Sequence, residues 1–180
     1  MLKSLILFFR RKNIGRNLQQ KRLLHFPDLN RSPEMTVMLD EGKKKDIKSI
    51  EQFVRNTFRP RKLRFVILCE TLPDNQFQND EAFFIIKKDF NIFGVLKKEK
   101  EERLKSFSDD LFVNFSDNNK NLLNDYLVSC VNSSFKIGHS GNNMKQYDLV
   151  LDYGIEKDEL ERMKILYKYL MMLSGNKNEK

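Results

Sequence analysis

The chain has 180 residues, enough for one ordinary domain but not for two. Hydrophobic residues make up 40% of it, with 15 Phe and no Trp, so the chain can bury a core and is not globally disordered. Its net charge of +8 is uneven, because the first 31 residues carry +7 and the remaining 149 about +1. Binding of a polyanion is therefore expected in the N-terminal arm rather than in the body.

The N-terminal arm, residues 1–31, combines an apolar stripe with a run of cations. Leu2, Leu5, Ile6 and Phe9 share one helical face, and residues 1–24 contain no acid. One interpretation is a surface arm that binds lipid headgroups or RNA. The other is a terminal helix that packs Leu5 and Phe9 on the body and leaves its charges in solvent. The candidate polyanion-binding residues are Arg10, Arg11, Lys12, Arg16, Lys21 and Arg22.

The opening apolar stretch does not read as a targeting signal, because its core, residues 5–9, is short and no small-residue cleavage site follows. No stretch approaches the length of a membrane span. Cys69 and Cys130 lack CxxC spacing, which favours buried thiols in a reducing compartment over a disulfide. We expect a cytoplasmic protein, with peripheral attachment at the inner membrane face as the alternative.

Beyond a short linker between Pro27 and Pro33, apolar runs typical of strands alternate with helical patterns. Predicted strands cover residues 35–40, 63–70, 82–86, 111–115, 135–138 and 147–153. Predicted helices cover residues 43–58, 99–107, 122–131 and 156–173. The second strand is almost continuously apolar after Arg64, which is typical of a parallel strand covered on both faces. We predict a single three-layer α/β domain over residues 32–175, with a largely parallel, Rossmann-like sheet, and a disordered tail at 176–180.

No motif in the body fixes a reaction. Neither GxxxxGK[ST], GxGxxG nor GxSxG occurs, and His25 and His139 are isolated, so we assign no cofactor, no metal site and no catalytic residue. The sequence favours a non-catalytic binding or adaptor protein over an enzyme. We expect the arm to bind an anionic surface, either membrane headgroups or RNA. We also expect a protein partner. The oligomeric state is left open.

An alternative is a binding or enzymatic site for a nucleotide-like or sugar-like small molecule at the carboxyl edge of the sheet, where loops and helix N-termini converge. Such a pocket should take residues from at least three loops. The competing interpretation is that the polar residues at this edge only cap helices or lie in solvated turns and bind no ligand. The candidate ligand-binding residues follow the first, second, fourth and fifth strands: Asp40, Gly42, Glu70, Ser116, Asn118, Gly138, His139 and Gly141.

Four stretches carry a resemblance to a family: residues 88–94 (KDFNIFG), 134–138 (SFKIG), 147–152 (YDLVLD) and 166–170 (LYKYL). Over about residues 35–173 the body resembles small uncharacterised bacterial proteins that are defined only as a domain of unknown function. That resemblance implies no catalytic residue. Residues 110–115, a helix and then 135–138 are also similar, locally, to a Rossmann-like half of heptosyltransferase-type glycosyltransferases, which supports the layer order but no chemistry.

Overall fold

The structure of the protein, a computed structural model, describes residues 2–41, 44–72, 81–117, 119–140, 143–153 and 158–175. Its strands form one sheet in the order β3-β2-β1-β4-β5-β6, and every pairing is parallel. The strands are β1 (Glu34–Asp40), β2 (Lys62–Leu68), β3 (Ala82–Ile85), β4 (Leu111–Asn114), β5 (Phe135–His139) and β6 (Leu149–Leu151). The predicted α/β fold with a parallel, Rossmann-like sheet is confirmed.

Strand β1 lies at the centre of the sheet and is covered on both faces. Val37 and Leu39 belong to one apolar cluster and Met38 to the other, as the alternation of side chains along a strand requires. It pairs with β2 on one side and with β4 on the other. The order of the strands therefore reverses between β1 and β4, which is where open α/β sheets commonly bind ligands.

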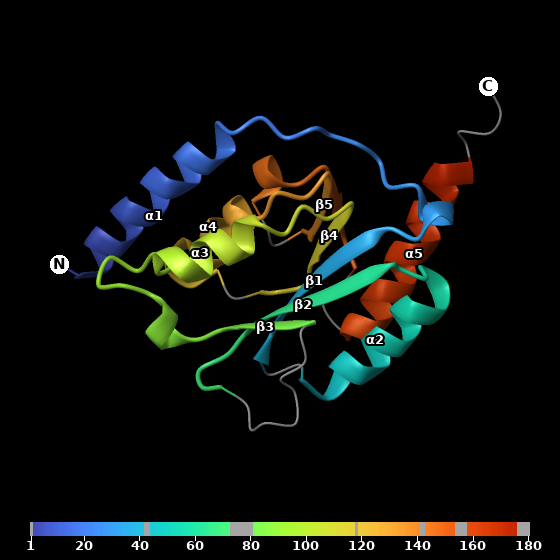
Figure 1. Cartoon of the computed structure of the whole chain (residues 1–180), viewed down its shortest axis with the longest axis horizontal. Helices are drawn as coiled ribbons and strands as arrows, with labels where there is room; N and C mark the ends of the chain where they lie inside the picture. Colours follow the sequence, from blue (N-terminus) through green and yellow to red (C-terminus); the bar gives the residue numbers. More distant parts are fainter. Residues whose placement is uncertain are drawn as a thin grey trace.

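Helices cover both faces of the sheet (Figure 1). They are α1 (Leu2–Leu18), α2 (Lys44–Thr57), α3 (Lys98–Lys105), α4 (Leu123–Cys130) and α5 (Glu159–Gly175). Helices α2 and α5 pack against each other over one face, where Ile50 and Leu166 are fully buried. Helices α1, α3 and α4 cover the other face, where Leu104 and Leu127 are fully buried. The result is a three-layer arrangement.

Two predicted boundaries need correction. Strand β6 begins at Leu149, not at 147, because a short 3-10 helix, Met144–Gln146, precedes it. Tyr147 follows this helix, and its hydroxyl accepts a hydrogen bond from Asn114 Nδ2 at 2.7 Å. Strand β2 ends at Leu68, not at 70. Helix α1 ends at Leu18. The chain then runs over the surface, and the His25 N–H donates to the Ser134 carbonyl at 3.3 Å.

Neither Cys69 nor Cys130 is in a disulfide; Cys130 is buried, as expected, whereas Cys69 is only half-buried. In the part of the chain that the structure describes, no helix is both long and apolar enough to cross a bilayer.

Candidate functional site

The carboxyl edge of the sheet has two halves. The first, at the ends of β1, β4 and β5, is closed by hydrogen bonds. The Ser116 hydroxyl donates to Asp40 Oδ1 at 2.7 Å, and the Asp117 N–H donates to Asp40 Oδ2 at 2.9 Å. Asp40 thus spans the point where the strand order reverses. We call these groups and their partners the closed half.

Two buried amides extend the closed half. Asn114 Oδ1 accepts the Ser116 N–H at 2.9 Å, and Asn114 Nδ2 donates to Asn124 Oδ1 at 3.0 Å. Asn124 Nδ2 in turn donates to the Ser116 carbonyl at 2.8 Å. The side chain of Asn124, in the first turn of α4, therefore fixes the loop that follows β4. Buried amides that exchange hydrogen bonds in this way hold a single geometry.

His139, at the end of β5, is also held in the closed half. Its Nε2 lies 3.2 Å from the Ser116 carbonyl and 3.1 Å from Asp117 Oδ1. Both neighbours are acceptors, which suits the imidazole tautomer whose N–H is at Nε2. Arg162 of α5 approaches the other carboxylate oxygen, with Nη1 3.9 Å from Asp117 Oδ2. The half-exposed carboxylate of Asp117 thus links two buried basic side chains, His139 and Arg162.

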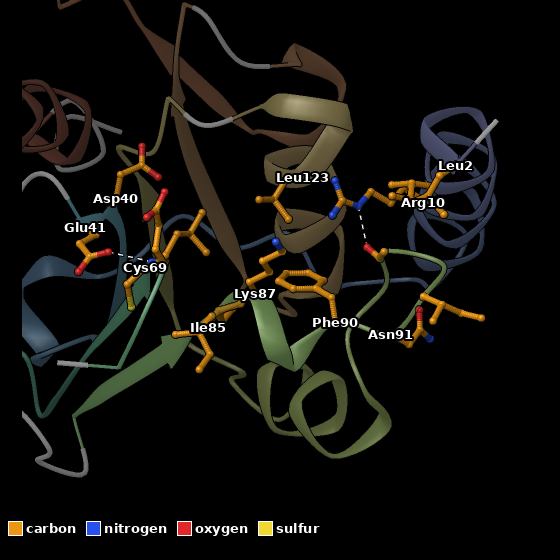
Figure 2. A pocket seen from close by; sticks show the side chains of 16 residues that line it. Leu2, Arg10, Asp40, Glu41, Cys69, Ile85, Lys87, Phe90, Asn91 and Leu123 are labelled. Carbon is orange, nitrogen blue, oxygen red and sulfur yellow. Dashed lines mark hydrogen bonds between the residues drawn. The ribbon is translucent and has the colours of Figure 1, made fainter.

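The second half of the edge, over β1, β2 and β3, is open and contains a pocket of about 670 Å³ (Figure 2). That volume suits a small molecule. Its walls come from strand ends, from the loop after β3, from the start of α4 and from α1. The apolar side chains among them are Leu2, Ile6, Leu68, Ile85, Ile86, Phe90, Ile92 and Leu123. We call this the open half. A smaller cavity of about 440 Å³ lies away from it, beside Arg59 and Tyr167.

Helix α1 forms the outer wall of the pocket because it docks closely on the loop after β3. Gly94 has a φ of +71°, and a Cβ there would lie 2.7 Å from Cγ2 of Ile6. The rings of Phe9 and Phe93 lie 4.4 Å apart, centre to centre. Close contact between α1 and this loop therefore depends on a glycine at position 94.

Arg10 fixes the same helix by hydrogen bonds. Its Nε donates to the Gly94 carbonyl at 2.7 Å, and its Nη1 donates to the carbonyls of Asn121 at 2.9 Å and Lys120 at 3.3 Å. Asn121 and Leu122 both have left-handed backbones, with φ of 54° and 58°, just before α4. Arg10 thus ties α1 to the loop after β3 and to this strained turn.

Arg10 is a buried cation at the wall of an apolar pocket. It is 7% exposed, and desolvation lowers its pKa. Its hydrogen-bond partners within the described residues are backbone carbonyls, with no carboxylate among them. Its guanidinium also lies 5.6 Å from the centre of the Phe90 ring. Lys87, exposed at the end of β3, lines the same pocket (Figure 2).

Carboxylates lie at the opposite end of the pocket, beside the tips of β1 and β2 (Figure 2). Glu41 Oε2 accepts the Glu70 N–H at 2.8 Å, and Asp40 joins this end to the closed half. A further hollow, of about 500 Å³, adjoins the pocket and shares Glu70, Ile86 and Lys87 with it. The pocket is thus apolar along its length, cationic toward α1 and anionic toward β1.

The predicted ligand-binding residues divide between the two halves. Asp40 and Glu70 line the pocket, whereas Ser116 and His139 belong to the closed half. Gly138 is buried within β5. Gly42, Asn118 and Gly141 lie outside the described residues. Among the described residues the pocket takes side chains from two of the four predicted loops, and the expectation of at least three stays a prediction. Ligand binding by these residues stays a prediction.

The arm residues also divide. Arg10 and Arg22 were expected to meet a polyanion, but both are held by the body: Arg22 donates to the carbonyls of Ser133 and Ser134 at 3.1 Å and pairs with Asp148. Arg16 lies 3.4 Å from Glu101 yet stays 61% exposed. Arg11, Lys12 and Lys21 are exposed, and polyanion binding by them stays a prediction. Phe9 packs on the body as the second interpretation of the arm required, but Leu5 is 42% exposed.

Sequence reasoning missed the wall residues Lys87, Phe90 and Leu123, and the place of Arg10. The third strand offered a signal, since the residues after it must reach the same edge as those after the others in a parallel sheet. No signal placed α1. No group of three or more His, Cys, Asp or Glu side chains that could hold a metal ion occurs within the described ranges.

Comparison with known proteins gives one match. No curated protein and no solved structure matches the chain. The model of a family of unknown function, DUF6913, matches residues 7–173, which include most of α1 and the whole sheet. The expected resemblance to a domain of unknown function is thereby confirmed, and the local likeness to glycosyltransferases stays a prediction. The chain belongs to the DUF6913 family, a family of unknown function.

Proposed function

We propose that the protein binds a small amphipathic molecule, an apolar chain or ring system with one anionic group, in the pocket beneath α1. The observation that carries the proposal is Arg10. A buried cation is normally paired with an anion, and within the described structure the hydrogen-bond partners of Arg10, at the wall of an apolar cavity, are all carbonyls. An anionic group of the ligand would supply the missing charge, with Lys87 beside it.

The two ends of the pocket give such a ligand a direction. Its anion would lie toward Arg10 and Lys87, because the carboxylates of Asp40, Glu41 and Glu70 would repel it at the other end. Its apolar part would cover Leu68, Ile85 and Phe90. The proposal builds on the small-molecule site that the sequence offered as an alternative. It assigns that site binding rather than catalysis, the class of function that the sequence favours. An adaptor role toward another protein stays a prediction.

The proposal is tested by protection of a thiol. Cys69 lines the pocket and is partly exposed, whereas Cys130 is 2% exposed and burial raises its pKa to about 11. A maleimide should therefore label Cys69 first. Dodecanoate, below its micelle concentration, should slow that labelling at least fivefold, whereas dodecyltrimethylammonium should have little effect.

Two lysines supply the variant and its control. Lys87→Glu should abolish protection by dodecanoate, because the added carboxylate lies in the pocket. Lys88→Glu, an exposed neighbour outside this pocket, should leave protection unchanged. Equal effects of the two variants, or no protection of the wild-type protein by either amphiphile, would contradict the proposal. Turnover of a bound molecule that Asp40→Ala or His139→Ala removes would replace binding with an enzymatic role.

A further inference from the structure

The outer face of α1 carries apolar side chains that the fold does not use. Ile6, Phe9 and Ile14 pack toward the body, and the inner face of the helix is thereby explained. Leu5 and Phe8 are on the outside, 42% and 60% exposed. A helix that needs only one apolar face to dock has no structural requirement for Leu and Phe on the other.

Cations surround these apolar side chains. Lys3, Arg11 and Lys12 are exposed on α1, and no acid occurs anywhere in residues 1–24. Lys12 follows Leu5 and Phe8 at helical spacing, seven and four residues on, so it lies on the same stripe. An apolar stripe flanked by cations, with no acid, is complementary to an anionic lipid surface.

The mouth of the pocket lies at the same end of the molecule. Leu2 and Ile92 line the pocket and are 63% and 76% exposed, and the neighbouring Phe93 packs against Phe9 of α1. The exposed apolar surface therefore continues from the helix to the loop after β3. Phe8 is the exposed ring on this surface, whereas binding of single-stranded RNA usually uses several aromatic platforms. The surface fits a bilayer better than RNA.

We infer that residues 3–12 of α1 dock the protein on an anionic membrane surface, with Leu5 and Phe8 among the lipid headgroups and Lys3, Arg11 and Lys12 against lipid phosphates. Docking in this way needs no occupied pocket. A docked molecule would also turn the pocket mouth toward the lipid, from which an amphiphile could enter; that consequence rests on the proposed function.

Co-sedimentation with vesicles tests the inference. The full chain should sediment with vesicles of phosphatidylglycerol and phosphatidylcholine in equal parts, but not with phosphatidylcholine alone, and 0.5 M NaCl should release it. The variant Lys3→Gln/Arg11→Gln/Lys12→Gln should lower the partition coefficient about 100-fold, since each cation contributes about fivefold at such a surface. Leu5→Ser/Phe8→Ser should lower it at least tenfold.

The matched control is Leu23→Ser/Leu24→Ser, which removes two leucines that are 90% and 65% exposed but lie outside α1. It should sediment like the wild-type protein. Equal loss in this control, equal binding to both kinds of vesicle, or binding of a single-stranded RNA oligomer in place of vesicles would overturn the inference. Circular dichroism checks that each variant is folded. Protection of Cys69 in vesicle-free solution should be unchanged in Leu5→Ser/Phe8→Ser, so failure of docking and failure of ligand binding are distinguishable.

Discussion

The two halves of the carboxyl edge use polar residues in opposite ways. In the closed half, Ser116 is joined to Asp40 through its hydroxyl at 2.7 Å and to His139 through its carbonyl at 3.2 Å. In the open half, Arg10 stands at the wall of an apolar pocket and Lys87 is exposed beside it. The difference teaches that the crevice between β1 and β4, where open α/β sheets commonly bind ligands, is filled here by the protein's own side chains. The pocket lies instead over β1, β2 and β3, where α1 forms its outer wall.

The largest expected effect concerns the wall of the open half. Arg10→Met removes three hydrogen bonds that seat α1 and should lower the free energy of unfolding by about 3 kcal/mol. Arg11→Met, an exposed neighbour, should change it by less than about 0.5 kcal/mol. Urea denaturation of both variants measures the difference. Similar values for the two would mean that α1 is not held by Arg10.

A pH titration tests a lysine of β5 that is buried against α4. Lys136 of β5 is 4% exposed, its Nζ donates to the Val128 carbonyl at 2.9 Å, and burial, with Arg22 nearby, lowers its pKa to about 8 despite the nearby Asp148. In the unfolded chain its pKa is about 10.4, so between these values the unfolded state binds more protons and stability rises with pH.

Relative to Lys136→Met, the wild-type protein should therefore gain up to about 3 kcal/mol of unfolding free energy from pH 8 to pH 10.5. Urea denaturation at several pH values, with the two proteins compared at each, isolates this group from the other titrating residues. A constant difference between them across that range would show that Lys136 is not a buried base.

The closed half should be sensitive to loss of its bridging carboxylate. Asp40→Ala leaves the Ser116 hydroxyl and the Asp117 N–H without this acceptor and should cost about 2 kcal/mol. Glu70→Ala, at the end of the adjacent strand and exposed, should cost less than about 0.5 kcal/mol. Thermal or urea unfolding checks both. If Glu70→Ala were the more harmful, the open half would hold the edge together instead.

The smallest expected effect concerns the close approach of α1. Gly94→Ala adds a Cβ at a positive φ and against Ile6, so it should cost about 1 kcal/mol or more. Gly15→Ala, within α1 and with open space around it, should stabilise the protein by about 0.5 kcal/mol. Opposite signs in urea denaturation are the expected result. A neutral Gly94→Ala would show that α1 can shift without loss.

Much of the fold could be predicted because the chemistry is local. The burial of β2 can be predicted from its own apolar run, and that of α2 from the helical spacing of Ile47, Ile50 and Val54. Asp40 and Glu70 could be placed at one edge because parallel strands end together. The role of Arg10 could not be predicted, since in sequence it resembles Arg11 and Lys12. What distinguishes it is contact with Gly94 and Asn121, 84 and 111 residues away.

The separation of those contacts has a consequence for how the protein is made. During synthesis α1 leaves the ribosome before its anchors at Gly94 and Asn121, which follow only after most of the sheet has been translated. Contacts over such distances form late, because a long loop must close first. The nascent chain therefore presents a cationic, apolar helix with an incomplete docking site until Asn121 has been translated. The wall that completes the pocket is the last part of it to be assembled.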